Sequence, residues 1–187
     1  AVPHLDPLAQ VVLCAASPDS QEIAREVEAA VVQAQAGRPG VVWIREMVDR
    51  PTAVQLYSQA SVFCCPSIYE PFGIINLEAM ACETPVVAAA VGGIREVVVH
   101  GETGFLVSVA QRAAPSFEPV RPDEFARDLA RSINTLLADP ALRLRLGAGG
   151  RRRVEEGFSW RAVAEKTLDL YRALLHADSP AQPPGGA

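Results

Sequence analysis

The chain has 187 residues, of which 49% are hydrophobic and 21% charged, and its formal net charge is −5. This length is enough for one hydrophobic core, and the composition is that of an ordinary globular protein. The acidic balance argues against nucleic acid as a partner, and no apolar run reaches the length of a membrane span. We therefore expect a soluble, cytoplasmic protein that has no membrane partner.

Short apolar runs alternate with helical patterns along most of the chain. The predicted strands are 11–14, 41–44, 61–65, 86–89 and 105–107, and the predicted helices between them are 17–36, 51–58, 74–83 and 94–99. Apolar runs of this length are typical of buried parallel strands. The alternation predicts an α/β fold with a doubly wound, Rossmann-like parallel sheet.

C-terminal helices are predicted to follow this sheet. A polar loop at 108–121 leads to helices at 122–138 and 140–156, and Ser159 caps a last helix. Residues 1–176 are thus predicted to form one domain, and the segment 177–187, ADSPAQPPGGA, reads as a disordered tail.

The four cysteines, Cys14, Cys64, Cys65 and Cys82, all fall in apolar strands or in the apolar helix at 74–83. None of them has the C-x-x-C spacing of a metal site. We interpret them as buried, reduced thiols, which agrees with a cytoplasmic location.

The most informative stretch is Pro66 to Pro85, PSIYEPFGIINLEAMACETP. Glu70 follows the strand 61–65, at the edge of a parallel sheet where ligands bind. The helix that follows is apolar almost all round, so Glu78 is predicted to be a buried carboxylate. At the start of this helix, the N–H groups of Phe72, Gly73, Ile74 and Ile75 have no partner within the helix and therefore attract anions.

Two interpretations of this stretch remain open. Glu78 pairs with an arginine in the core while Glu70 is solvated, or the two carboxylates belong to a sugar-phosphate pocket. The second is plausible because a carboxylate accepts several hydrogen bonds from sugar hydroxyls. Gly92 and Gly93, which follow the strand 86–89, are either a second phosphate-binding loop or a plain strand-to-helix turn.

The spacing of Glu70 and Glu78 resembles the E-x7-E signature of family 4 retaining glycosyltransferases, which have the two-domain GT-B fold. The longer string CPSIYEPFGIINLEAMACETPVVAAAVGGIREVVVHGETGFLV is similar to bacterial glycogen synthases of the actinobacterial type. The resemblance extends from about residue 11 to about residue 175. It implies that the chain is the C-terminal, donor-binding domain of such an enzyme.

The resemblance also implies a reaction and a set of site residues. Glucose would pass with retention from ADP-glucose or UDP-glucose to the end of an α-1,4-glucan, with no metal or other cofactor. Glu70 would be the catalytic residue and bind sugar hydroxyls, and Glu78 would bind the ribose. The remaining donor contacts would be the amides of Phe72, Gly73, Ile74 and Ile75, the base contacts Met47 and Val48, the neighbouring Thr84, and the diphosphate loop Gly92 and Gly93.

Some features of the family have no counterpart in these 187 residues. The GT-B fold includes an N-terminal acceptor domain. The family also places an arginine and a lysine against the diphosphate, near the first strand of the donor domain. Here the single lysine is Lys166, which lies in the predicted last helix. We therefore expect the chain alone to be inactive. The alternatives are the donor domain of a mannosyl- or sucrose-type transferase, and a non-catalytic nucleotide-sugar-binding module.

Two further expectations follow from the resemblance and concern the last helix and the sheet, which would lack neighbours that the family has. The last helix is predicted to expose the apolar residues Trp160, Tyr171 and Leu175. The central first strand of the doubly wound order is absent from the sequence, which would leave a gap beside the strand 11–14. Because unpaired buried backbone groups are costly, we expect strand 11–14 to pair directly with strand 61–65 in one five-stranded sheet.

Overall fold

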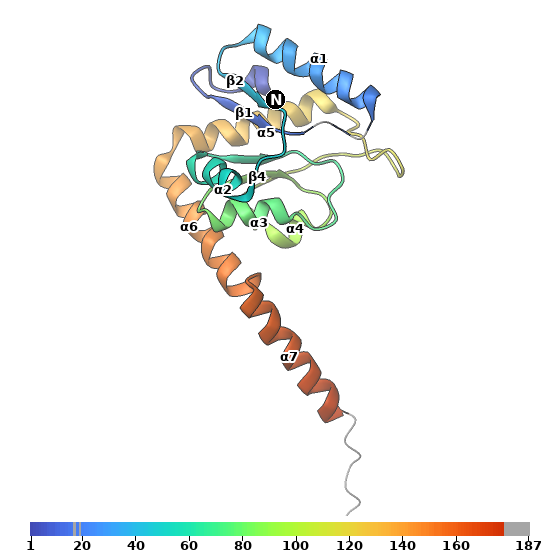
Figure 1. The fold of residues 1–187 in the computed structure, drawn as a ribbon, viewed down its shortest axis with the longest axis vertical. Helices are drawn as coiled ribbons and strands as arrows, with labels where there is room; N and C mark the ends of the chain where they lie inside the picture. The colour runs from blue at the N-terminus through green and yellow to red at the C-terminus, as the bar shows by residue number, and fades with distance from the viewer. Residues whose placement is uncertain (17, 19, 178–187) are drawn as a thin grey trace, which may run out of the picture.

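The computed structural model describes residues 1–16, 18 and 20–177 and contains two parallel sheets with helices around them (Figure 1). One sheet pairs β1 (Val11–Cys14) with β2 (Val41–Ile44). The other has the order β3-β4-β5, formed by Phe63–Cys65, Val86–Ala89 and Gly104–Val107. All paired strands are parallel, which confirms the predicted α/β fold.

The helices follow the predicted positions closely. They are the 3-10 helix η1 (Val2–His4), α1 (Gln21–Gly37), α2 (Arg50–Gln59), α3 (Ile74–Ala81), α4 (Ile94–Val97), α5 (Pro122–Ala138), α6 (Pro140–Gly157) and α7 (Trp160–Ala177). The side chains of Ser20, Asp49 and Asp139 cap α1, α2 and α6 by accepting N–H groups of the first turn. Ala177, predicted to begin the tail 177–187, is the last residue of α7. The rest of that tail, and Ser17 and Asp19 in the predicted start of α1, lie outside the described residues.

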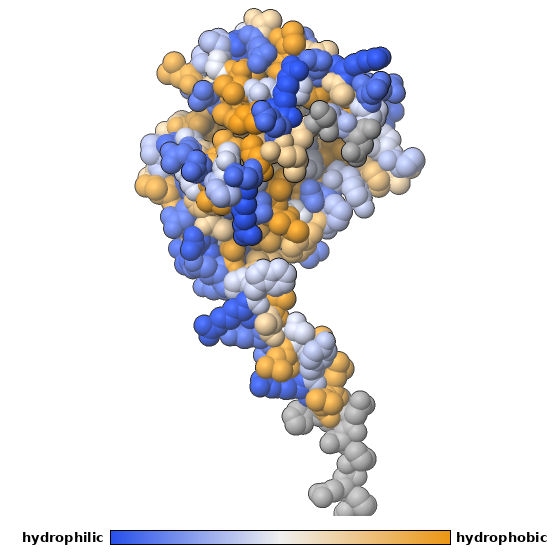
Figure 2. Space-filling view, viewed as in Figure 1, coloured by the Kyte–Doolittle hydropathy of each residue, from blue (hydrophilic) through white to orange (hydrophobic). Residues whose placement is uncertain are grey.

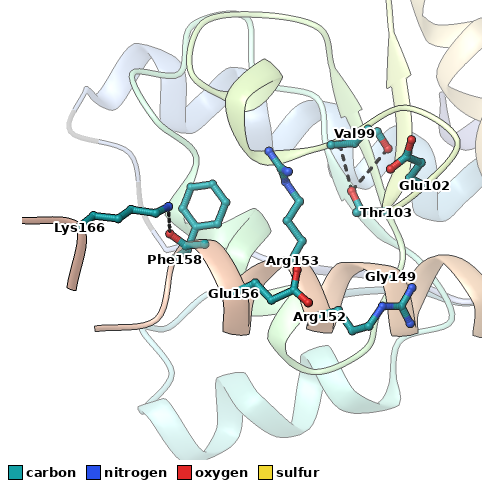
Figure 3. A pocket seen from close by; sticks show the side chains of 10 residues that line it. Val99, Glu102, Thr103, Gly149, Arg152, Arg153, Glu156, Phe158 and Lys166 are labelled. Atoms are coloured by element: carbon teal, nitrogen blue, oxygen red, sulfur yellow. Dashed lines mark hydrogen bonds between the residues drawn. The ribbon is translucent and has the colours of Figure 1, made fainter. Parts of the chain in front are cut away.

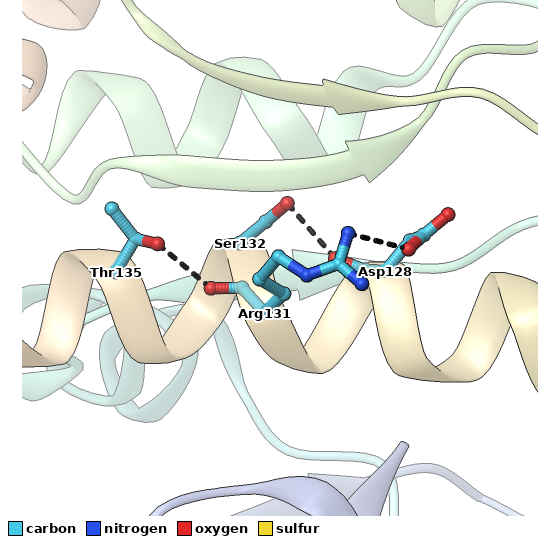
Figure 4. Close-up of polar contacts among 4 residues, drawn as sticks. All are labelled: Asp128, Arg131, Ser132 and Thr135. Carbon is cyan, nitrogen blue, oxygen red and sulfur yellow. Dashed lines mark hydrogen bonds and ion pairs between the residues drawn. The ribbon is translucent and has the colours of Figure 1, made fainter.

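The hydrophobic core surrounds β4, the central strand of the larger sheet. All four residues of β4 are fully buried, and Leu136 of α5 and Met80 of α3 are buried against the same core. The polar side of α5 is occupied by contacts within the helix, including an Arg131–Asp128 ion pair of 2.8 Å (Figure 4). Such a partly exposed pair contributes little stability, so burial of the apolar side is what fixes α5 in place.

Helix α6 packs closely on the segment that contains α3. A side chain at Gly147 would overlap the carbonyl oxygen of Glu83, and a Cβ at Gly150 would lie 3.2 Å from the Cβ of Met80. The run Gly147-Ala-Gly-Gly150 therefore permits close helix packing. It lies within a helix and follows no strand, as its position in the sequence indicates.

The predicted pairing of β1 with β3 is wrong. Within the described part of the chain, no ladder joins the two sheets. The prediction assumed that the gap between these strands is buried, whereas Val12 of β1 is 46% exposed and Cys14 is also exposed. Backbone groups beside these residues can be hydrated, so the penalty for leaving them unpaired does not arise. In the view of Figure 1, apolar surface runs down the middle of the molecule (Figure 2).

The N-terminal segment is held by side chains instead of by a strand ladder. The guanidinium group of Arg38 donates hydrogen bonds to several of its carbonyls, including that of Asp6 at 2.8 Å. Asn134 of α5 accepts the N–H of Asp6 at 2.9 Å and donates to the carbonyl of His4 at 3.0 Å. Arg38 and Asn134 thus tie residues 1–10 to α1 and α5 and satisfy backbone groups that no strand pairs.

The cysteines are all free, but not all are buried as predicted. Cys65 is 2% exposed, whereas Cys14 is exposed because it lies on the uncovered face of β1. Burial raises the pKa of the Cys64 thiol to about 12. The Cys64 thiol is therefore expected to react much more slowly than the exposed Cys14 thiol, since the thiolate is the reactive form.

This difference can be measured by alkylation of the folded chain. We expect iodoacetamide at pH 8 to modify Cys14 first, and Cys64 at least about a hundredfold more slowly, because so little of it is thiolate. Peptide mass spectrometry over time gives the rate for each cysteine, and the same reaction in denaturant provides the reference. Equal rates for Cys14 and Cys64 in the folded chain would contradict the described burial.

Helix α7 projects away from the two sheets (Figure 1). Trp160 is 90% exposed and Leu175 is 74% exposed, and Tyr171 is exposed as well. The expected apolar surface on the last helix is therefore confirmed. Among the helices of the described ranges, none is both long and apolar enough to cross a membrane.

Candidate functional site

The loops that follow β3 and β4 meet at the carboxyl edge of the larger sheet. The loop at 66–73 connects β3 to α3, and the loop at 90–93 connects β4 to α4. The N–H of Gly93 donates to the carbonyl of Glu70 at 3.0 Å, so the two loops touch through their backbones. Ligands bind at this edge in open α/β sheets, which makes it the candidate site.

Gly92 and Gly93 are required by this contact between the loops. A side chain at Gly92 would overlap the carbonyl of Glu70, and a Cβ at Gly93 would lie 2.5 Å from the Cα of Phe72. Gly92 also has a left-handed φ of 44°. The pair therefore has a packing role, while Gly92 itself remains exposed at the site.

The Glu70 carboxylate is available for a ligand. Its side chain is half-buried, and within the described part of the chain it has neither a hydrogen bond nor an ion pair. Gly73, three residues later, is the N-cap of helix α3; it has φ 96° and provides no side-chain cap. The N–H of Asn76 donates to the carbonyl of Gly73, whereas those of Ile74 and Ile75 have no partner among the described residues. A carboxylate beside such a helix start suits a ligand that carries both hydroxyls and an anion.

Helix α3 is more open than predicted. Glu78 is exposed, Ile74 is 62% exposed and Ile75 is 41% exposed, while Ala79 and Met80 are fully buried. The difference arises because α6 packs against the side of α3 that carries Met80, whereas Ile74, Ile75 and Glu78 lie on the uncovered side. Composition alone did not reveal this, since α3 has apolar residues on both sides.

Within the described ranges, Glu78 forms no ion pair. Its Oε2 atom accepts a hydrogen bond of 3.2 Å from the hydroxyl of Tyr57, which lies in α2. Burial, with a contribution from Glu78, raises the pKa of Tyr57 to about 12, so this hydroxyl is protonated at neutral pH. Tyr57 could not be predicted from the sequence, because it lies 21 positions before Glu78 and only folding brings the two together.

Thr84 lies behind this pair and is 2% exposed. Its hydroxyl donates a 2.6 Å hydrogen bond to the carbonyl of Tyr57. Thr84 precedes β4 and is connected to Glu78 only through Tyr57, whose backbone it holds.

Met47 and Val48 lie in the loop that follows β2. Met47 is 86% exposed and Val48 is half-buried. Asp49 ends this loop by capping α2 through the N–H of Thr52 at 2.9 Å. In the described ranges, no hydrogen bond connects Met47 or Val48 to the Glu70 loop.

The segment 108–121, expected to be a polar loop, forms a hairpin-like turn that contacts the site. Gln111 donates to the carbonyls of Ile68 and Phe117, and the Phe117 and Tyr69 rings lie 5.3 Å apart. This turn therefore supports the two residues that immediately precede Glu70.

A separate cleft of about 410 Å³ lies at the junction of α6 and α7 (Figure 3). It is bordered by Val99 and Thr103, which precede β5, and by Phe158, whose ring lies 6.1 Å from that of Phe72 in the Glu70 loop. Its basic residues are partly engaged, since Arg153 donates to the carbonyls of Val97 and Glu96. Across the described ranges, no cluster of three or more His, Cys, Asp or Glu residues is placed to hold a metal ion.

Parallel strands flanked by helices, with the Glu70 loop at the strand ends, make this a Rossmann-like α/β domain. Residues 10–116 match the family model for glycosyl transferases group 1, and the chain belongs to this family.

Several relatives support this assignment. The chain is 49% identical over 168 residues to the alpha-maltose-1-phosphate synthase of Mycolicibacterium smegmatis, covering 90% of this chain and 41% of the relative. It is 34% identical over 136 residues to the glycogen synthase of Mycobacterium tuberculosis, covering 73% of this chain and 30% of the relative. The chain thus spans less than half the length of these relatives.

The solved structures agree on the fold. Sucrose-phosphate synthase from Thermosynechococcus elongatus superposes with a TM-score of 0.70 at 37% identity, over 90% of this chain and 39% of the other. The Anabaena protein Alr3699/HepE in complex with UDP-glucose has a TM-score of 0.72 at 22% identity, over 92% and 43% of the two chains. The second similarity supports the fold alone.

Proposed function

We propose that this chain is the donor-binding part of a glucosyltransferase that uses ADP-glucose or UDP-glucose, retains the anomeric configuration and needs no metal. The observation that carries the proposal is the unpaired Glu70 carboxylate beside the uncapped start of α3. Glu70 is the catalytic residue and accepts hydrogen bonds from the sugar hydroxyls. The amides of Phe72, Gly73, Ile74 and Ile75 bind sugar and phosphate oxygens.

In this proposal the chemistry consists of positioning the sugar and stabilising the leaving diphosphate. Glu78 binds the ribose hydroxyls, and Gly92 and Gly93 border the diphosphate. Met47 and Val48 contact the base, and both belong to a loop with exposed apolar surface.

For the acceptor we propose α-D-glucose 1-phosphate. The 49% identity to an alpha-maltose-1-phosphate synthase supports this choice, because adding one glucosyl unit to glucose 1-phosphate gives a maltose phosphate. Extension of an α-1,4-glucan is the second candidate, supported by the similarity to glycogen synthase. For either acceptor we propose that further residues of the intact protein bind it, because the chain spans less than half the length of these relatives.

A transfer assay on the intact gene product tests this proposal. ADP-glucose, UDP-glucose, GDP-glucose and GDP-mannose are each offered with glucose 1-phosphate, glycogen or fructose 6-phosphate. We expect glucosyl transfer from ADP-glucose or UDP-glucose to glucose 1-phosphate. Transfer only to glycogen would favour the second candidate, and transfer only from GDP-mannose or only to fructose 6-phosphate would overturn both.

Replacing Glu78 by glutamine should weaken binding of ADP or UDP by roughly 1–3 kcal/mol, because a charge-assisted hydrogen bond to the ribose is lost. Calorimetric titration of the intact protein gives the change. Glu26→Gln, the same charge change on the exposed surface of α1, is the matched control and should leave the affinity unchanged. Equal affinities for Glu78→Gln and the wild type would contradict the assigned role.

A further inference from the structure

We propose that Tyr57 is a positioning residue that holds the Glu78 carboxylate in the orientation needed to bind the donor ribose. This inference rests on the proposed function, because it requires Glu78 to contact the nucleotide. Tyr57 itself acts through Glu78.

The contact between these residues defines what Tyr57 does. Its hydroxyl donates to Oε2 of Glu78 at 3.2 Å, and in the described part of the chain this is the only hydrogen bond of that carboxylate. The carboxylate is otherwise exposed, so Oε1 and the remaining lone pairs of Oε2 are free to accept hydrogen bonds from vicinal ribose hydroxyls.

Tyr57 is itself held from several sides. Its carbonyl accepts hydrogen bonds from the Thr84 hydroxyl at 2.6 Å and from the N–H of Ala60 at 3.1 Å. Its ring packs edge-on against Phe63 of β3, with the centroids 5.3 Å apart and the planes at 81°. The phenol is thus a rigid donor fixed to both β3 and the residue that precedes β4.

The charge state of Tyr57 suits this role. Because burial raises its pKa to about 12, the hydroxyl is a donor throughout the neutral range and does not repel the carboxylate. The thiols of Cys14 and Cys82 are the other titratable groups close enough to influence it.

A fixed carboxylate binds more tightly than a mobile one. An unrestrained exposed glutamate samples several rotamers, and selecting one of them on binding costs free energy. Replacing Tyr57 by phenylalanine should therefore weaken binding of ADP and UDP about 3- to 10-fold. The kcat at saturating donor should stay within about twofold, because the ribose lies away from the reacting atoms.

The experiment is a double-mutant cycle in the intact gene product, with variants Tyr57→Phe, Glu78→Ala and the double variant. Calorimetry measures the affinity for ADP and UDP and for their 2′-deoxy forms. We expect Tyr57→Phe to weaken binding in the wild type, to have no further effect in the Glu78→Ala background, and to have a smaller effect on the 2′-deoxy nucleotides. Tyr171→Phe on the exposed surface of α7 is the matched control.

The outcomes separate this inference from the proposed function. The positioning role would be overturned if Tyr57→Phe bound ADP and UDP as tightly as the wild type. It would also be overturned if Tyr57→Phe lowered the affinity equally in the wild type and in the Glu78→Ala background. Wild-type affinity in Glu78→Ala would instead refute the ribose contact of Glu78 and, with it, both claims. Thermal unfolding of each variant checks the fold, and the affinity for 2′-deoxy nucleotides shows that the rest of the site is intact.

Discussion

Replacing Glu70 by alanine should reduce glucosyl transfer by the intact protein about a hundredfold or more. Glu70 lies in the loop that follows β3, next to the start of α3, where its carboxylate would bind the sugar during transfer. Removing one preorganised polar group from such a site typically costs two to three orders of magnitude in kcat. Initial rates at saturating donor and acceptor measure the effect.

The Glu70→Ala variant should still fold, because the carboxylate has no partner within the described residues. Removing it therefore leaves no hydrogen-bond donor or cation without a partner. Circular dichroism and the melting temperature check this point. Glu70→Gln, which keeps the size and one acceptor oxygen, should retain more activity than Glu70→Ala. An Ala variant within a factor of a few of the wild-type rate would show that Glu70 is not catalytic.

The second large effect is expected at Gly93, where the substitution to alanine should destabilise the protein by about 1–3 kcal/mol. The added Cβ would lie 2.5 Å from the Cα of Phe72 and would overlap the carbonyl of Pro71. Both neighbours are backbone atoms of the Glu70 loop, so the loop has to move. Nucleotide binding should fall with stability, because the same loop leads into the first turn of α3.

Gly157→Ala is the matched control for this substitution. It places the same methyl group at the end of α6, where no atom lies within 4 Å, so its stability should match or exceed that of the wild type. Denaturant unfolding of the two variants gives the comparison. A Gly93→Ala variant as stable as Gly157→Ala would contradict the described contact between the two loops.

Much of the fold could be predicted from local sequence patterns. The apolar runs at 11–14, 41–44 and 86–89 became strands at those positions, and α5 spans Pro122–Ala138 as expected. These predictions hold because strand formation depends on short apolar runs, and helix formation on an apolar face with a start signal such as Pro122. The position of Glu70 shortly after a strand could also be predicted, because the apolar run before it indicates that strand.

The environment of Glu78 could not be predicted in this way. The apolar composition of the segment 74–83 indicated a helix buried all round, but α6 covers the Met80 side of α3 while Glu78 remains exposed. Its partner, Tyr57, comes from a different helix. Which side of an apolar helix is covered depends on the elements that pack on it, and these are far away in the sequence.

The sequence by itself determined the parallel α/β class, the order of the elements and the E-x7-E spacing, because each follows from short-range pattern and residue type. Only the tertiary structure decided how those elements meet. It separated β1 from β3, where an exposed face of β1 removed the penalty that favoured direct pairing. It also brought Gly93 against Glu70, where two loops meet at the carboxyl edge of the larger sheet, and Tyr57 against Glu78, where α2 packs beside α3.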